Sequence, residues 1–214
     1  MLEDRRLIAG LIEACREIIA THADRLSELD RAIGDGDHGT NMRRGCEAVF
    51  AAREEIAALP LPQAIERIGT TLVMSVGGAA GPLYGTLLIE IGRRLAGEDG
   101  EPDFGDALDG AIAAVARRGK AARGEKTLLD VLYPVQAEVV RRTALGQVAL
   151  GQIELGRIAA CAEESARSTI PMRAMRGRAS FLGDRSIGHM DPGASSCALL
   201  TSAICRYFEE YRPA

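Results

Sequence analysis

Apolar residues that recur at intervals of three and four constrain the fold of this chain more than any other feature of its sequence. The pattern is clearest at 7–19, 104–115 and 197–211, where it forms the stripe of a helix that faces a core. Weaker patterns of the same kind cover 40–57, 62–75, 81–96, 126–144 and 153–171. The alternation typical of strands is not sustained anywhere. The sequence therefore predicts an all-α fold, a single domain over residues 1–214 built as an antiparallel eight-helix bundle or barrel.

Charge, hydropathy and cysteine content exclude several kinds of protein. The formal net charge is −4, and no Lys/Arg run is long enough to follow a phosphate backbone, so we expect no nucleic-acid partner. No apolar run approaches the ~20 residues that span a bilayer, and the N-terminus lacks the uninterrupted apolar stretch of a signal peptide. The 5 cysteines include no C-x-x-C pair, which is typical of a reduced protein with buried thiols. We therefore expect a cytoplasmic protein with no membrane partner.

Four glycine-rich segments interrupt the helical pattern. These segments, motifs 1 to 4 in chain order, are Leu29–Asn41 (LDRAIGDGDHGTN), Ser75–Gly85 (SVGGAAGPLYG), Gly119–Thr127 (GKAARGEKT) and Arg176–Ser196 (RGRASFLGDRSIGHMDPGASS). In an otherwise regular helical protein, irregular segments are where binding and catalytic residues concentrate. The function is therefore expected to reside in these four motifs.

Three aspartates stand close together in motif 1. Asp30, Asp35 and Asp37 lie within eight residues, and glycines between and after them allow the backbone to fold sharply. Converging carboxylates repel one another unless a divalent cation neutralises them, and hard oxygen ligands favour magnesium or calcium. The alternative is a solvated acidic turn with the carboxylates apart. The glycines and the third aspartate favour a metal site.

Motifs 1 and 3 can be compared with three other known sequence motifs. An EF-hand loop that starts at Asp35 fails because its twelfth position is Cys46 and not glutamate. The glycines of 34–39 fit the pattern G-x-G-x-x-G, but that pattern requires a preceding strand, and the preceding residues are helix-like. In motif 3, Glu125 intrudes before the Lys-Thr pair of a Walker-type loop. None of the three is favoured.

Three motifs run into helix N-termini, where unpaired N–H groups and the helix dipole suit a phosphate group. Residues 75–82 precede an apolar helix that begins near Leu83, and Gly39–Asn41 and Asp191–Ala194 also open helices. The alternative for each is simple helix capping or tight packing through small residues. The histidines of motifs 1 and 4, His38 and His189, are interpreted as hydrogen-bonding structural residues.

The four motifs together resemble the L subunit of dihydroxyacetone kinases, in order and spacing. The letters that carry the resemblance are Leu29–Asn41 (LDRAIGDGDHGTN), Ser75–Gly85 (SVGGAAGPLYG), Arg118–Asp130 (RGKAARGEKTLLD) and Gly177–Ser195 (GRASFLGDRSIGHMDPGAS). The resemblance implies an antiparallel eight-helix barrel with the nucleotide site in loops at one end. It also implies that Asp30, Asp35 and Asp37 hold two Mg²⁺ ions, which bridge the phosphates of ADP or ATP.

The resemblance further implies which residues contact the nucleotide. They are His38, Gly39, Thr40, Asn41, Gly78, Ala79, Ala80, Gly119, Leu128, Arg178, Asp191, Pro192 and Gly193. No catalytic residue is expected in this chain beyond the metal cluster. Two departures from the family pattern are Ala80, where serine is frequent, and Glu125, where aspartate is common.

The activity implied is phosphoryl transfer to a hydroxyl of a short ketose such as dihydroxyacetone, held by a separate K subunit. The resemblance leaves open whether bound ADP is rephosphorylated by a phosphohistidine protein of the phosphotransferase system or whether ATP exchanges. A homodimer or a hetero-oligomer is expected. The alternatives are a same-fold phosphotransferase for a tetrose or a fatty acid, a nucleotide-loaded module that regulates a transcription factor, and a metal-stabilised scaffold without nucleotide.

Overall fold

The structure of the chain, a computed structural model, describes residues 2–97, 104–144 and 154–211. These ranges contain helices and no strand. The elements are α1 (Leu2–Ile33), α2 (His38–Ala51), α3 (Arg53–Ala57), α4 (Leu61–Ser75), α5 (Ala80–Leu95), α6 (Phe104–Gly119), α7 (Leu129–Ala144), α8 (Leu155–Ser168), the 3₁₀ segment η1 (Arg178–Ser186) and α9 (Pro192–Glu210). The prediction of an all-α fold is confirmed.

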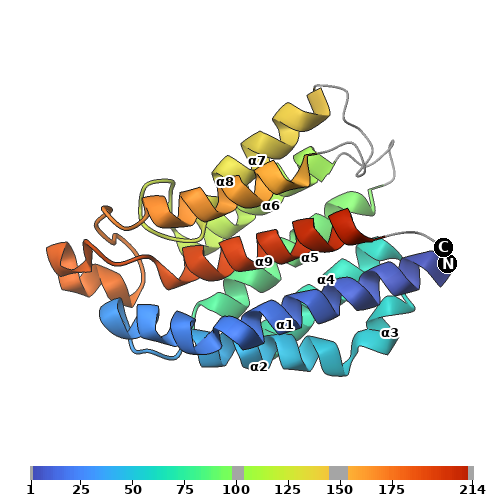
Figure 1. The fold of residues 1–214 in the computed structure, drawn as a ribbon, viewed down its shortest axis with the longest axis horizontal. Coiled ribbons are helices and arrows are strands. Elements are labelled where there is room, and N and C mark those ends of the chain that lie inside the picture. Colours follow the sequence, from blue (N-terminus) through green and yellow to red (C-terminus); the bar gives the residue numbers. More distant parts are fainter. Residues whose placement is uncertain (1, 98–103, 145–153, 212–214) are drawn as a thin grey trace.

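The long helices pack in a closed order around one core (Figure 1). Contacts join α1 to α2, α2 to α4, and then each helix to the next along the chain as far as α9. Because α9 packs in turn against α1, the order closes into a ring. Apolar side chains from each of these helices fill its interior, and Ile19, Leu26, Ile112 and Val131 are completely buried there.

The stretch 40–57, expected as one helix, is divided into α2 and α3. The amide of Ala52 bonds to the carbonyl of Val49 at 3.1 Å, a tightened turn that ends α2 and redirects the chain. The redirected α3 buries Ile56 completely and packs against α1. The described residues therefore contain more helical elements than the eight expected, because 40–57 forms two helices and the short η1 lies outside the periodic stretches.

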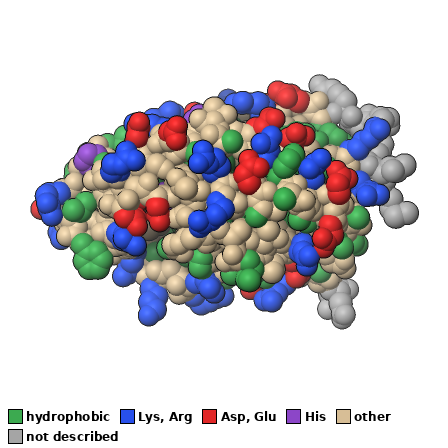
Figure 2. All heavy atoms as spheres, turned by 90° about the horizontal axis from the view of Figure 1, so that it is seen from below, with side chains coloured by type: hydrophobic (Ala, Val, Ile, Leu, Met, Phe, Trp, Pro, Cys, Tyr) green, Lys and Arg blue, Asp and Glu red, His purple; other side chains and the backbone are tan. Residues whose placement is uncertain are grey.

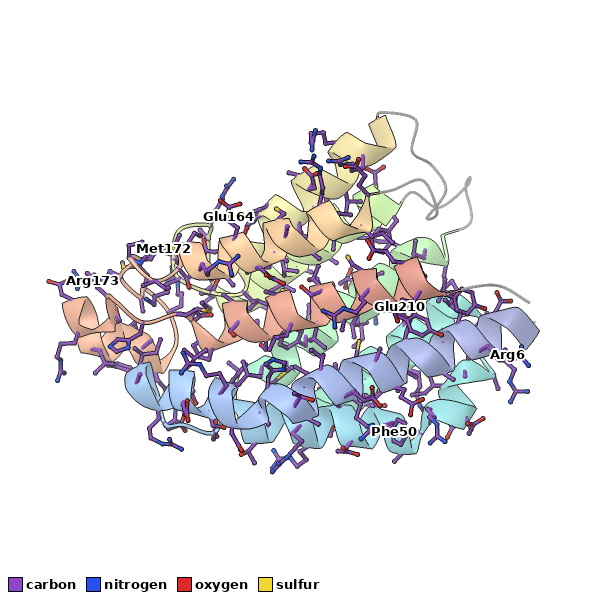
Figure 3. The ribbon with its side chains drawn as sticks, viewed as in Figure 1. Arg6, Phe50, Glu164, Met172, Arg173 and Glu210 are labelled. Carbon is purple, nitrogen blue, oxygen red and sulfur yellow. The ribbon has the colours of Figure 1, made fainter. Side chains whose placement is uncertain are left out.

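The connections that carry motifs 1 to 4 gather at one end of the molecule (Figure 1). The start of α1 and the end of α9 lie at the opposite end. Figure 3 shows the same polarity, with Met172 and Arg173 at the motif end and Arg6 and Glu210 at the other. Consecutive helices in the ring run in opposite directions, so alternate connections share an end. This topology brings together segments that are far apart in the sequence.

The outer surface carries mixed charge. Basic and acidic side chains are interspersed over the face drawn in Figure 2. In the described ranges, no helix combines the length and apolar character that a membrane crossing demands.

Candidate functional site

A cleft of about 550 Å³ lies where the four motifs meet. Its lining residues fall within the ranges 30–41, 77–84, 115–129, 176–179 and 191–193. Each motif contributes to this lining, so the tertiary structure joins segments separated by up to about three quarters of the chain. The acidic residues of motif 1 and the basic residues of motif 4 face the same space.

The loop between α1 and α2 brings the three aspartates together. The Oδ2 atom of Asp30, in the last turn of α1, accepts hydrogen bonds from the amides of Asp37 at 2.8 Å and His38 at 3.1 Å. Gly36 takes a positive φ of 80°, which lets the loop fold back over Asp30. One ligand atom from each of Asp30, Asp35 and Asp37 then lies within 4.8 Å of the others.

This donor set fits a hard divalent cation. Carboxylate oxygens are the ligands that Mg²⁺ and Ca²⁺ prefer, and Mg²⁺ keeps several water ligands. Asp35 and Asp37 are exposed, which leaves space for such waters and for phosphate oxygens. Arg178 Nη1 lies 2.9 Å from Asp35 Oδ2, so a basic residue of motif 4 already partly balances the acidic cluster. The chemistry of these three carboxylates therefore fits a divalent cation.

The three helix N-termini at the cleft differ in which groups accept hydrogen bonds from their first backbone amides. At α5, the N-cap residue Ala79 provides no side-chain cap, so amides at this N-terminus remain available to an anion. At α2, the amide of His38 is bonded to Asp30. At α9, the side chain of Asp191 accepts from the amide of Ala194 at 2.7 Å. Among these three, α5 is best prepared to receive a phosphate group.

Most of the residues expected at the site line the cleft. The lining includes Asp30, Asp35, Asp37, His38, Asn41, Gly78, Ala79, Ala80, Gly119, Leu128, Arg178, Asp191, Pro192 and Gly193. Gly39 and Thr40 are outside this lining. Gly39 is buried against α1, where a Cβ would collide with the carbonyl of Ala23 and the hydroxyl of Ser27, whereas Thr40 is exposed. In this structure Gly39 permits close packing of α2 on α1.

Sequence reasoning missed the apolar part of the cleft. Ile33, Leu83, Val115 and Leu129 line it. Ile33 and Leu83 lie within motifs 1 and 2, and Val115 and Leu129 lie in periodic helical stretches. Apolar residues at such positions are also typical of a helical core, so the sequence could not separate the two roles. These side chains give the cleft an apolar portion beside its acidic one, a combination typical of small-molecule sites.

A chain of polar groups joins α2, α5 and α9 in the cleft wall. His38 Nε2 lies 2.9 Å from Ser196 Oγ, which lies 2.7 Å from the hydroxyl of Tyr84. The Tyr84 hydroxyl also donates to the carbonyl of Gly193 at 3.3 Å. Burial lowers the pKa of His38, although Asp30 and Asp37 oppose the change. His38 is thus a hydrogen-bonded part of the wall, in line with its interpretation as a structural residue.

Asp191 is the acidic group of the cleft whose pKa departs most from its ordinary value. Burial raises its pKa to about 7, while the Ala194 amide and the nearby Lys126 act in the opposite direction. Asp130 and Asp30 raise the pKa of Asp191 further through charge repulsion. Asp191 therefore changes charge near neutral pH in the protein without ligands.

The family model described as the DAK2 domain matches residues 32–206, which include all four motifs apart from Leu29–Arg31 at the start of motif 1. The chain belongs to the DAK2-domain family. The chain is 41% identical over 206 residues to the ADP-binding subunit DhaL of the PEP-dependent dihydroxyacetone kinase of Escherichia coli (strain K12), and the match covers 94% of this chain and 95% of that protein.

Other similar proteins carry a DAK2-like region within a longer chain. The D-erythrulose kinase of Mycolicibacterium smegmatis is 37% identical over 204 residues, or 93% of this chain and 35% of that protein. The crystal structure of the dihydroxyacetone kinase from C. freundii in complex with AMP-PNP and Mg²⁺ matches with a TM-score of 0.73 at 24% identity, over 94% of this chain and 34% of that chain. This structural similarity shows that the DAK2 domain described above shares its fold with part of that kinase.

Proposed function

We propose that this DAK2 domain is the nucleotide-holding L subunit of a dihydroxyacetone-type kinase. It would present a magnesium-bound nucleotide whose phosphoryl group passes to a hydroxyl of a short ketose held by a separate K subunit. The observation that carries this proposal is the convergence of the carboxylates of Asp30, Asp35 and Asp37 in one cleft with the uncapped N-terminus of α5. The similarity to the ADP-binding subunit from E. coli along nearly the whole chain supports it.

Each part of the cleft has a distinct task in this proposal. Asp30 shapes the loop through its two amide contacts, and Asp35 and Asp37 offer exposed oxygens to two Mg²⁺ ions. Amides at the start of α5 bind phosphate oxygens. When bound, the ions supply charge neutralisation and orientation of the transferred phosphoryl group. Arg178, beside Asp35, adds a further positive charge at the phosphates.

The acceptor side of the reaction belongs to a partner. The cleft residues perform binding and charge stabilisation, which are the main requirements of phosphoryl transfer. We therefore propose that the K subunit holds and activates the ketose, within a hetero-oligomer in the cytoplasm, and that residues 1–214 form a single nucleotide-binding domain. For the phosphoryl donor, the resemblance to the PEP-dependent relative favours bound ADP that a phosphohistidine protein rephosphorylates.

A second candidate is the same chemistry on another acceptor. Similarity to the D-erythrulose kinase of M. smegmatis supports a tetrose as that acceptor. Because the acceptor binds to the partner, the metal and nucleotide sites of this chain would be the same in both cases. Assays that combine the chain with K-type partners and with three-carbon and four-carbon ketoses distinguish them by rate.

The first experiment is a native mass spectrum of the purified chain with Mg²⁺ and ADP. We expect a mass increase of one ADP with about two Mg²⁺ ions, the number that phosphoryl-transfer sites commonly use. ADP that is present before any is added favours the bound-cofactor mechanism. No binding at saturating ADP would overturn the proposal and leave a helical interaction module as the alternative.

A further inference from the structure

The side chain of Lys126 ends in a cage of main-chain carbonyl groups. Lys126 is only 1% exposed, although it lies in the connection between α6 and α7. Its Nζ atom contacts the carbonyl oxygens of Thr169 at 2.9 Å, Ile170 at 3.5 Å, Met172 at 3.0 Å, Ser186 at 2.9 Å and His189 at 2.5 Å. A Walker-type loop, which the sequence did not favour, would direct this lysine to a phosphate; here its ammonium group is directed to main-chain carbonyls instead.

The number of oxygens in the cage exceeds what hydrogen bonding alone requires. An ammonium group has three N–H donors, whereas five carbonyl oxygens surround this one. The contact is therefore largely between a charge and carbonyl dipoles. Proteins coordinate dehydrated monovalent cations in the same way, with rings of main-chain carbonyl oxygens. Without a positive charge, the negative ends of these dipoles would face one another at close range.

The backbone of Lys126 is held in an unfavourable conformation to reach the cage. Its φ is +63°, in the left-handed region that non-glycine residues seldom adopt. Burial lowers the pKa of its ammonium group, while Asp191 acts in the opposite direction. A buried charge and a strained backbone at one residue are both costly, so the contacts of the cage must compensate for them.

The carbonyls of the cage belong to both ends of the α8–α9 connection. Thr169, Ile170 and Met172 follow α8, and Ser186 and His189 precede α9. Figure 3 labels Met172 at this end of the molecule, directly after α8. The middle of the same connection, residues 176–179, lines the cleft. A charge that draws the two ends of the connection together therefore also positions the cleft wall between them.

We propose that the ammonium group of Lys126 acts as a built-in monovalent cation, which organises the α8–α9 connection as a wall of the nucleotide cleft. Lys126 is thus a positioning residue. The cage that it fills is a latent site for K⁺ or NH₄⁺, which either ion can occupy once the side chain is removed. Because Lys126 also lines the cleft, its removal opens a path for ions to the cage. The effect on nucleotide binding rests on the proposed function, whereas occupation of the cage does not.

The test compares Lys126→Ala with Lys120→Ala in different salts. These are the only lysines in the sequence, both have a positive φ, and Lys120 is exposed, so Lys120→Ala is a matched control. Thermal stability without ligand and affinity for ADP with Mg²⁺ are measured in KCl, NH₄Cl and tetramethylammonium chloride at an ionic strength of about 0.15 M.

For Lys126→Ala in tetramethylammonium chloride, we expect a lowered melting temperature and an ADP affinity reduced by roughly tenfold or more, as for other residues that support a site. K⁺ or NH₄⁺ should restore a large part of both properties, since these ions fit a cage of carbonyls and tetramethylammonium does not. Wild type and Lys120→Ala should be indifferent to the choice of cation. A Lys126→Ala protein that binds ADP normally, or that responds equally to all three cations, overturns the proposal.

A measurement on the folded chain with Lys126 intact covers the case in which Lys126→Ala does not fold in any of the salts. In Lys120→Arg protein labelled with ¹⁵N-lysine, Lys126 supplies the single side-chain ammonium signal. We expect its protons to be protected from solvent exchange and to couple to carbonyl carbons across the cage. A rapidly exchanging signal would refute the cage. If wild type fails to bind ADP while K⁺ still stabilises Lys126→Ala selectively, the proposed function is wrong and the cage remains.

Discussion

At the scale of single residues, the three aspartates of the acidic cluster differ in their hydrogen bonds and in their exposure. Asp30 is tied to the amides of Asp37 and His38, whereas the carboxylates of Asp35 and Asp37 are exposed. One aspartate therefore shapes the loop, and the other two present exposed carboxylates for the metal site that we propose. The same residue type performs two tasks because its surroundings differ.

Replacement of Asp35 or Asp37 by asparagine should abolish phosphoryl transfer in the presence of the partner subunit. The neutral amide lowers metal affinity by on the order of 10- to 100-fold or more, while the helices remain intact because both residues are exposed. Phosphoryl transfer and the far-ultraviolet circular dichroism are the measurements. Asp24→Asn, an exposed position on the same helix as Asp30, should be unaffected. Near-normal turnover of either variant would contradict the assignment.

Ala80→Ser restores the residue that is frequent in the family. Ala80 is the first residue of α5 and lines the cleft, so a serine hydroxyl there can reach a bound phosphate. We expect normal folding and an ADP affinity that is unchanged or tighter by about threefold, the gain from one net hydrogen bond. Calorimetric titration with ADP and Mg²⁺ measures it. A sharp loss of affinity would show that this loop packs differently.

At the scale of elements, two helix N-termini are fixed by contacts that the family pattern does not reveal. The first turn of α2 packs on α1 through Gly39, which has no space for a Cβ beside Ala23. The first turn of α9 is capped by Asp191, whose carboxylate is partly buried in the cleft wall. Both contacts position residues of the site without touching a ligand.

Gly39→Ala should destabilise the protein by about 1–3 kcal/mol, the cost of an added methyl group in a tightly packed position. The added Cβ forces α2 away from α1 and thereby displaces the neighbouring Asp37 and His38. Denaturant unfolding measures the loss, and Thr40→Ala, at an exposed position, is the control for stability. A fully stable Gly39→Ala protein would mean that the α1–α2 contact is looser than described.

The cap of α9 should make stability depend on pH in ligand-free, metal-free protein. In the folded state the pKa of Asp191 is about 7, against an ordinary value of 3.8. The folded state therefore binds this proton more tightly than the unfolded state, and stability decreases as pH rises from about 4 to about 7. Asp191→Asn retains a good N-cap residue, and its stability should lack this dependence on pH. Unfolding free energies of both proteins across that range are compared; parallel profiles would exclude the effect.

At the scale of the whole molecule, the closed ring places four connections at one end. The cleft is lined from all of them, so a ligand in it contacts segments that are far apart in the sequence. Binding is therefore expected to stabilise the molecule as a whole and not one hairpin.

Saturation with ADP and Mg²⁺ should raise the unfolding free energy by about 3 kcal/mol when ligand is present at roughly 100 times its dissociation constant. ADP with a chelator should give a much smaller rise, because the carboxylates then repel the phosphates. Thermal unfolding with and without Mg²⁺ measures the difference. Equal stabilisation under both conditions would show that nucleotide binding does not depend on metal held by the aspartate cluster.

Much of this protein could be predicted from its sequence. The all-α class was predicted correctly, since helical periodicity is a local property of neighbouring residues. The family was also predicted correctly from four motifs in register, and the DAK2-domain match confirms it. The cluster of Asp30, Asp35 and Asp37 could be expected because short spacing and glycines already favour convergence. The division of 40–57 into α2 and α3 was missed, since no breaker residue marks the turn at Ala52.

Only the tertiary structure decided the roles that depend on distant contacts. Lys126 is separated from the carbonyls of its cage by 43 to 63 residues, and no local pattern indicates that they meet. Gly39 belongs to a predicted phosphate-binding segment, yet its environment is set by a neighbouring helix. The sequence by itself determined the helices and the chemistry of each motif, because both arise from residues close along the chain. The closed ring of helices decided which motif residues reach the cleft, because helix packing sets the neighbours of each loop.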